Sequence, residues 1–267
     1  MRKQRLDIVI IIEVEDTLMN IGIIIQARLG STRLPRKILK EFYGGKTLLE
    51  TVIYNLQKSG DVPSIVATSI NHNNDELESF LKERGIIVYR GSEDDVLSRF
   101  IGAAEANGVY GIVRICSDNP FLDWHGVADL IEKAKTSDAD YIGYRINNTP
   151  SIKTHFGFWG EYVTLDALKR VASTTDEKPA HEHVTIHIYT HPDEYKCEWI
   201  ECPDYLQGRN DIRLTVDNIE DFKNALMVYK ALYDDNPDFD LGDVVKYIDE
   251  HAELHDSMKQ MIENNQK

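Results

Sequence analysis

The chain has 267 residues and a formal net charge of −15, with 42% hydrophobic and 28% charged residues. This composition is ordinary for one large globular domain, and the negative balance argues against general nucleic-acid binding, which needs a basic face. Cys116, Cys197 and Cys202 lack C-x-x-C spacing, so we expect neither a disulfide framework nor a structural zinc site, and a reducing, cytoplasmic compartment fits.

Residues 1–20 begin with basic side chains and hold a short apolar run at 8–12. Acidic residues flank this run, no small-residue cleavage site follows it, and it is too short to span a bilayer. We therefore expect an N-terminal extension over 1–20 rather than a signal peptide or membrane anchor. A single domain over 21–255 and a polar tail over 256–267 would follow. The alternative for the first segment is an edge strand.

The stretch IGIIIQARLGSTRLPRK, residues 21–37, predicts a buried strand that runs into a cationic loop. Its first residues are apolar without alternation, which is typical of a parallel strand covered on both faces. Arg28, Arg33 and Lys37 then follow the carboxyl end of that strand, where α/β folds bind ligands. Gly30 allows close approach of the backbone to a ligand, and the cationic groups suit phosphate oxygens. We interpret the loop as a polyphosphate cradle, with a solvated basic loop as the alternative.

Strands and helices alternate over the following hundred residues, which predicts a mostly parallel sheet between two helical layers, a three-layer α/β/α sandwich. The predicted elements are a helix capped by Thr47, a strand at 64–68 that ends at Thr68, a helix at 75–84, a strand at 86–89, a helix capped by Ser92, a strand at 111–116, a helix at 127–134 and a strand at 139–143. A last strand at 212–216 and a last helix at 241–254 are expected near the end of the chain.

The simple alternation breaks at about 144–201, which we interpret as an inserted α+β segment with a helix at 164–173. This segment contains the histidine-rich string HEHVTIHIY. His183 and His187 are spaced to share a helical face, but the H-E-x-x-H pattern is absent because His181 lies only two residues before His183. A zinc site is therefore not expected here.

Two aspartates stand at predicted strand ends. Asp118 follows the strand at 111–116, and Asp217 follows the strand at 212–216. Each could simply cap the next helix. However, carboxylates at this edge of the sheet would meet the cationic loop, and Mg²⁺ is usually bound by one or two carboxylates together with phosphate oxygens. Asp118 is therefore the first candidate for a Mg²⁺ ligand beside the cradle.

The string QARLGSTRLPRK resembles the N-terminal signature of the CMP-sugar synthetases, which transfer CMP from CTP to an acidic sugar. Arg28, Ser31, Arg33, Pro35 and Lys37 fall on the CMP-Kdo synthetase pattern A-R-x-x-S-x-R-x-P-x-K. The wording is most similar to the spore-coat polysaccharide biosynthesis branch of these cytidylyltransferases. Further matches to the family are RGSEDDVL at 90–97 and EHVT at 182–185. SDNP at 117–120 resembles the family pattern G-D-x-P with Ser117 in place of Gly, and DNIEDF at 217–222 resembles D-T-P-E-D-L with Asn218 for Thr and Ile219 for Pro.

This resemblance implies a Rossmann-like mixed sheet of the nucleotide-diphospho-sugar transferase type, a Mg²⁺-dependent cytidylyltransferase activity and a homodimer. Arg28, Lys37 and Asp118 would be catalytic, and Asp118 and Asp217 would bind Mg²⁺. Glu182 and His183, in the segment that carries acceptor and dimer contacts, would touch the acceptor sugar. The motifs and strand ends together suggest a set of nucleotide contacts: Gln26, Ala27, Arg28, Gly30, Ser31, Arg33, Lys37, Thr68, Arg90, Gly91 and Ser92.

Two alternatives stay open. The same chemistry could use GTP or another nucleoside triphosphate with a sugar 1-phosphate as acceptor. A protein of a different class, a nucleotide-binding sensor or scaffold without catalysis, could use the same cradle. In all three cases the partners are small molecules, and neither nucleic acid nor a membrane is expected.

Overall fold

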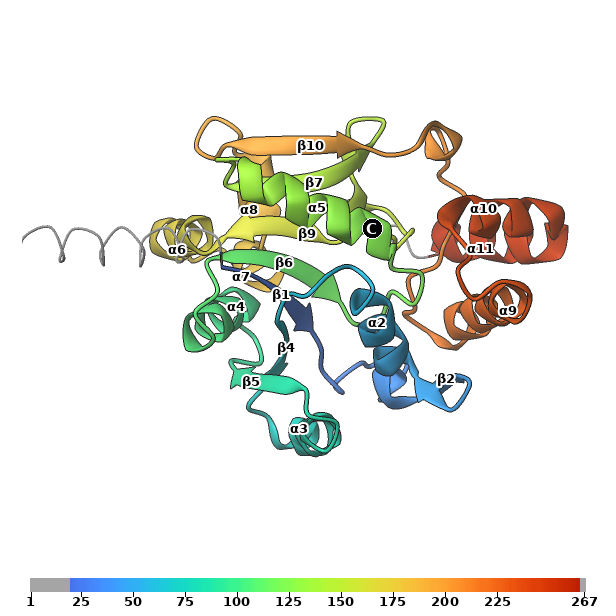
Figure 1. Ribbon diagram of the computed structural model, residues 1–267, viewed down its shortest axis with the longest axis horizontal. Coiled ribbons are helices and arrows are strands. Elements are labelled where there is room, and N and C mark those ends of the chain that lie inside the picture. The colour runs from blue at the N-terminus through green and yellow to red at the C-terminus, as the bar shows by residue number, and fades with distance from the viewer. Residues whose placement is uncertain (1–19, 265–267) are drawn as a thin grey trace, which may run out of the picture.

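The computed structural model describes residues 20–264, so all but the last residue of the extension predicted at 1–20 and the last three residues of the predicted tail lie outside this range. Within it, eight strands form one mixed sheet in the order β10-β7-β9-β6-β1-β4-β5, with β8 paired to β7 (Figure 1). The strands of this sheet are β1 (Ile21–Gln26), β4 (Ser64–Ser69), β5 (Ile87–Gly91), β6 (Gly111–Cys116), β7 (Tyr141–Ile146), β8 (Thr149–Pro150), β9 (Glu161–Thr164) and β10 (Cys197–Glu201). Strands β2 (Glu41–Tyr43) and β3 (Lys46–Thr47) form a separate hairpin.

The central strand β1 runs parallel to β4 and β6, so the carboxyl ends of these strands meet at one edge of the sheet. Strand β9 is antiparallel to both β6 and β7, which makes the sheet mixed. Strands β8, β9 and β10 come from the segment predicted as an insertion, and all three extend the same sheet.

Helices cover both faces of the sheet, as predicted. The alternation of β1 sends Ile23 and Ile25 into a core with α2 (Leu48–Leu56), α3 (Asp75–Lys82) and α5 (Trp124–Thr136). Ile24 points to the opposite core, which is built with α4 (Val96–Ala106), α6 (Leu165–Thr174), α7 (Lys178–Glu182) and α8 (Ile186–Thr190). These two cores confirm the three-layer architecture.

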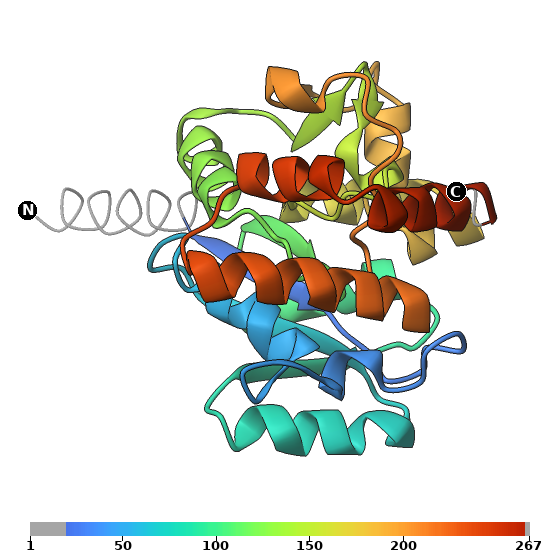
Figure 2. The ribbon, with the colours of Figure 1, turned by 90° about the vertical axis from the view of Figure 1, so that its right-hand side faces the viewer.

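A third apolar core holds the C-terminal helices α9 (Ile219–Asp235), α10 (Leu241–Glu250) and α11 (Ala252–Asn264). They gather at one side of the sheet in Figure 1, and Figure 2 shows α9 beside α10 and α11. The prediction of a single last helix at 241–254 is wrong, because the helix is interrupted at His251, between α10 and α11. Residues 256–264, predicted as part of a tail, continue α11 because Met258 is buried in this core.

Two further predictions are corrected. Residues 212–216 form no strand, because the backbone N–H groups of Leu214 and Val216 bond to the carbonyl groups of His155 and Asp118 instead of to a neighbouring strand. The N-cap of α4 is Asp95, whose carboxylate accepts from the Ser98 N–H, while the Ser92 hydroxyl accepts from the N–H of Asp95 one turn earlier.

Among residues 20–264, the helices are too short or too polar to cross a bilayer.

Candidate active site

The loop after β1 is held in a defined shape by its own backbone and by a neighbouring amide. The Leu29 N–H donates to Oδ1 of the buried Asn74 at 2.8 Å, and the Leu34 N–H donates to the Ser31 hydroxyl at 3.3 Å. Leu29 and Leu34 are both buried. With its apolar residues anchored in the core, the loop holds its cationic side chains at the carboxyl edge of the sheet.

Asp118 and Asp217, which are 99 residues apart in the sequence, meet at the same edge. The Val216 N–H donates to the Asp118 carbonyl oxygen at 3.0 Å, which ties the two aspartate segments together directly. Asn218 then begins α9 with a reciprocal capping box, in which its side chain accepts from the Asp221 N–H and the Asp221 carboxylate accepts from the Asn218 N–H. Capping is thus carried out by Asn218 and Asp221, which leaves the Asp217 carboxylate available to the site.

Two cations of the loop, Lys37 and Arg33, converge on the two carboxylates. The Lys37 ammonium lies 2.7 Å from Oδ2 of Asp118 and 3.7 Å from Oδ1 of Asp217, and it also donates to the Val216 carbonyl. Arg33 lies 3.0 Å from Oδ1 of Asp217. Burial acts to lower the pKa of Lys37, but Asp118 and Asp217 outweigh it and the pKa is raised, so the ammonium stays charged.

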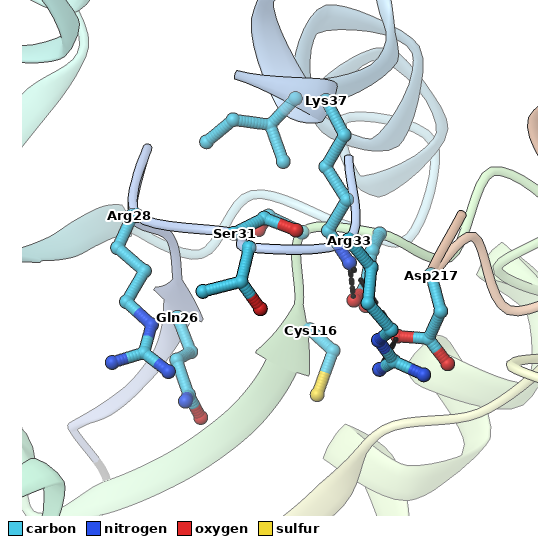
Figure 3. Close-up of a pocket in the computed structure, with 12 residues that line it drawn as sticks. Gln26, Arg28, Ser31, Arg33, Lys37, Cys116 and Asp217 are labelled. Carbon is cyan, nitrogen blue, oxygen red and sulfur yellow. Dashed lines mark hydrogen bonds and ion pairs between the residues drawn. The ribbon is translucent and has the colours of Figure 1, made fainter. Parts of the chain in front are cut away.

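These side chains line a cavity of about 310 Å³. In Figure 3, Gln26 and Arg28 lie at one side of this cavity, and Arg33, Lys37 and Asp217 lie at the other. Its lining residues are Gln26, Arg28, Gly30, Ser31, Thr32, Arg33, Lys37, Ile38, Cys116, Ser117, Asp118 and Asp217. The cavity therefore combines the predicted cationic loop with both predicted carboxylates.

A second cavity of about 190 Å³ adjoins the first and shares Arg33, Cys116, Asp118 and Asp217 with it. Its own wall is a mixture of apolar, mostly aromatic, and uncharged polar side chains: Asn119, Ser151, Ile152, Thr154, Phe156, Phe158, Trp159 and Thr215, with Gly157. The shared carboxylates thus stand between a cationic chamber and an aromatic, hydroxyl-lined one.

Several predicted contacts lie away from these cavities. Ala27 and Thr68 are buried, and neither lines a cavity described above. Arg90 is bound by acids of α3, at 2.7 Å from Asp75 and 2.6 Å from Glu78. Gly91 and Ser92, which follow Arg90, do not line them either. Glu182 and His183 are exposed outside both.

Two residues near the site escaped the sequence analysis. Arg213 is buried and places Nη2 3.0 Å from Oδ2 of Asp217, while its Nε lies 2.7 Å from Asp221. The signal for it was a cation inside the apolar string IRLTV, followed by acids four and eight residues later. The Glu93 carboxylate forms an ion pair with Arg28 at 3.2 Å, which links the cationic loop to the turn before α4.

The geometry suits a divalent cation bound together with a polyphosphate. The Lys37 ammonium lies between the two carboxylates and within ion-pair distance of both, so both carboxylates can contact the same positive charge. Within residues 20–264, no three His, Cys, Asp or Glu side chains gather as a metal site. A two-carboxylate site of this kind leaves the remaining ligand positions to phosphate oxygens and water, as Mg²⁺ prefers.

Comparison with known proteins agrees with this arrangement. The family model described as cytidylyltransferase matches residues 22–265. An uncharacterized protein of Methanocaldococcus jannaschii is 35% identical over 232 residues, covering 86% of this chain and 91% of that protein. The spore coat polysaccharide biosynthesis protein SpsF of Bacillus subtilis is 32% identical over 241 residues, covering 86% of this chain and 94% of that one.

Among solved structures, a cytidylyltransferase from Leptospira borgpetersenii aligns with a TM-score of 0.76 at 26% identity, covering 88% of this chain and 96% of that one. The matches extend over both aspartate segments and the cationic loop, so the resemblance noted in the sequence is confirmed. The chain belongs to the cytidylyltransferase family.

Proposed function

We propose that this protein transfers CMP from CTP to an acidic sugar and releases pyrophosphate, for the synthesis of a cell-surface polysaccharide or glycan. The observation that carries the proposal is the meeting of Arg28, Arg33 and Lys37 with Asp118 and Asp217 around one cavity. Cations for a triphosphate and carboxylates for its metal ion are the two requirements of nucleotidyl transfer. The acidic sugar is supported by the resemblance to CMP-sugar synthetases.

In the reaction, a hydroxyl oxygen of the sugar attacks the α-phosphorus of CTP and its proton passes to solvent. The bond from that phosphorus to the β-phosphate oxygen breaks, and pyrophosphate leaves with the bonding electrons. Arg28, Arg33 and Lys37 would bind phosphate oxygens and stabilise the charge that develops on the leaving pyrophosphate. Asp118 and Asp217 would hold Mg²⁺, which when bound neutralises phosphate charge. The lining includes no obvious nucleophile for covalent catalysis, and positioning with electrostatic stabilisation is sufficient for such a displacement.

The second cavity is the natural place for the acceptor. It is lined by the same two carboxylates as the cationic cavity, so an acceptor hydroxyl there would lie close to the phosphates of a nucleotide bound in that cavity. Its aromatic walls can pack against the apolar faces of a sugar ring, and its hydroxyl and amide groups can bond to sugar hydroxyls. This placement replaces Glu182 and His183, which are exposed elsewhere, as the proposed acceptor contacts.

We further propose that the enzyme acts in the cytoplasm as a homodimer, which is supported by the family resemblance. Light scattering coupled to size-exclusion chromatography measures the mass directly, and a mass of one chain at micromolar concentration would contradict the dimer.

The proposed reaction is tested by a thermal-shift panel with CTP, GTP, UTP, ATP and dTTP, each with and without Mg²⁺, followed by a pyrophosphate-release assay with acidic sugars. A ligand at one hundred times its dissociation constant stabilises by about 2.7 kcal/mol, which is a visible shift. Stabilisation by CTP that depends on Mg²⁺ is expected. Preference for another nucleotide would transfer the proposal to a sugar 1-phosphate acceptor, and no response to any nucleotide would overturn it.

A further inference from the structure

A row of mostly buried polar side chains crosses the sheet from the end of β1 to the turn between α7 and α8. Arg114 on β6 stands directly opposite Glu161 on β9, and its Nη1 lies 2.6 Å from Oε2 of Glu161. The other terminal nitrogen, Nη2, donates to Oε1 of Gln26 at 3.1 Å. Arg114 and Glu161 are both buried, whereas Gln26 lines the cationic cavity.

Glu161 is in turn held by two hydroxyl groups. The Tyr141 hydroxyl donates to Oε1 at 2.6 Å, and the Thr185 hydroxyl lies 3.2 and 3.1 Å from the two carboxylate oxygens. The position of Tyr141 depends on Gly143, because a Cβ at residue 143 would lie 2.4 Å from the tyrosine oxygen. Both oxygens of this buried carboxylate therefore have defined partners.

The backbone next to Thr185 is strained. Val184 has φ of 54°, a left-handed conformation that is unusual for a β-branched residue and costs on the order of 1–3 kcal/mol. The strained residue is buried and directly precedes the threonine that bonds to Glu161. This gives a structural role to the EHVT string: its last residues complete the buried row, while Glu182 and His183 stay exposed.

The row determines which way the Gln26 amide faces. A guanidinium group has donors only, so the amide atom 3.1 Å from Arg114 must be the carbonyl oxygen. The Gln26 NH₂ group is then the part of the amide that remains for a ligand in the cavity. An amide that could rotate would offer either a donor or an acceptor, whereas this one offers a donor.

We propose that Gln26 is a fixed hydrogen-bond donor to the bound nucleotide, and that Arg114, Glu161 and Thr185 are positioning residues that keep it so. The inference rests on the proposed function, since it requires a nucleotide in this cavity. The atom that receives the bond is a phosphate oxygen or an oxygen or nitrogen acceptor of the nucleoside.

Calorimetric titration of the full chain with CTP and Mg²⁺ tests the proposal. Gln26→Met removes the donor without adding charge, and we expect about a tenfold weaker affinity, as for a lost hydrogen bond of roughly 1.4 kcal/mol. Thr185→Val touches no ligand, and we expect CTP binding weakened about threefold, on the order of one partly lost hydrogen bond. Thr185→Ser keeps the hydroxyl and should bind CTP as the wild type does.

Ser59→Ala is the matched control, because it removes another buried hydroxyl, which donates to the carbonyl of Leu56 at the end of α2. A purely structural row would lower the melting temperature of Thr185→Val and leave its CTP affinity unchanged, which would overturn the positioning role. If Thr185→Val does not fold, Gln26→Met decides, and unchanged affinity there overturns the donor role. Repeating the titration with pyrophosphate separates a phosphate contact, weakened for both ligands, from a nucleoside contact, weakened for CTP alone. A wild-type protein that binds no nucleoside triphosphate would overturn this inference and the proposed function together.

Discussion

The Lys37 ammonium lies 2.7 Å from Oδ2 of Asp118, in the position where a carboxylate that binds a metal ion would be expected to hold its cation. Asp217 is likewise satisfied by protein cations, with Arg33 on one oxygen and Arg213 on the other, each at 3.0 Å. In this structure, the groups proposed for the triphosphate and those proposed for the metal ion therefore neutralise one another. A nucleotide that draws Lys37 and Arg33 onto its phosphates would free the carboxylates, so nucleotide and metal ion should favour each other's binding.

Lys37→Met separates the competition of Lys37 with the metal ion from its role in turnover. Without the competing ammonium, the carboxylate pair should bind Mn²⁺ more tightly in the absence of nucleotide, by about threefold or more, since one ion pair of modest strength no longer competes. Turnover should fall by about 10²-fold or more, as for loss of a charge-stabilising group. Mn²⁺ titration followed by electron paramagnetic resonance measures the first effect. The exposed Lys40→Met is the control, and unchanged Mn²⁺ affinity in Lys37→Met would contradict the competition.

Asp118→Asn keeps the size of the side chain and the backbone bond to Val216, so the fold should be preserved. Turnover should fall by more than about tenfold, which corresponds to about 1.4 kcal/mol in the activation free energy. Pyrophosphate release at saturating CTP measures it. Asp129→Asn, an exposed change on α5, should behave as wild type. Full turnover in Asp118→Asn would remove this residue from the site.

The sequence alone predicted the three layers and the edge of the sheet that carries the site. The apolar run of β1 and the strand–helix alternation were the signals, because a parallel strand that is buried on both faces is nearly always a continuous apolar run. Residues 212–216 are likewise predicted as a strand, yet they form none. What distinguishes them is the set of carbonyl partners that folding supplies, those of His155 and Asp118, and no local pattern contains that information.

Within the site, the cationic loop and the two aspartates were predictable because their chemistry follows strand ends in recognisable motifs. The supports of those residues were not. Arg213 reaches Asp217 and Asp221 from an irregular segment, and Arg114 reaches Glu161 through an antiparallel register between β6 and β9. The Arg114–Glu161 pair depends on which strands become neighbours, which the sequence alone leaves open.

Arg213→Met should destabilise the protein strongly. The guanidinium is buried with ion pairs to Asp217 and Asp221, and removing one partner leaves buried charge unpaired. The expected loss is about 3–5 kcal/mol of unfolding free energy. Urea denaturation measures it, with Arg145→Met as the surface comparison, because the Arg145–Glu201 pair is exposed and should contribute less than about 1 kcal/mol. Equal losses in the two variants would contradict the structural role of Arg213.

Gly157→Ala tests the wall of the second cavity. Residue 157 has φ of +68°, and an added Cβ would lie 2.7 Å from Oδ1 of Asn119 and 3.1 Å from Cγ2 of Thr215. Gly45→Ala is the matched control, because Gly45 has φ of +75° but open space around it. Backbone strain alone should cost about 1 kcal/mol in either variant, and Gly157→Ala should lose about 1–3 kcal/mol more from overpacking. Urea denaturation of both variants measures the difference. Equal losses of unfolding free energy would show that the wall of the second cavity shifts to accommodate the added Cβ.

His181 should make stability depend on pH near neutrality. Its Nε2 lies 2.9 Å from the Thr175 carbonyl oxygen and its Nδ1 lies 3.0 Å from the Asp95 carboxylate, so both contacts are satisfied only by the doubly protonated ring. The Thr175 carbonyl, followed by Asp95, raises the pKa of His181 above its ordinary value of 6.5. A raised pKa in the folded state contributes stability that is fully present below pH 6.5 and is lost as the pH rises through the folded value.

Urea denaturation at pH 6 and pH 8 measures this contribution as the difference between wild type and His181→Gln. The difference should be larger at pH 6, because protonation of His181 then favours the folded state, and it should shrink at pH 8. His183→Gln, an exposed histidine two residues later, should show no such change. A difference that is the same at both pH values would mean that the contacts of His181 with Asp95 and Thr175 do not depend on its charge. Since Asp95 is the N-cap of α4 and His181 lies in α7, hydrogen exchange should locate the lost stability where these two helices meet.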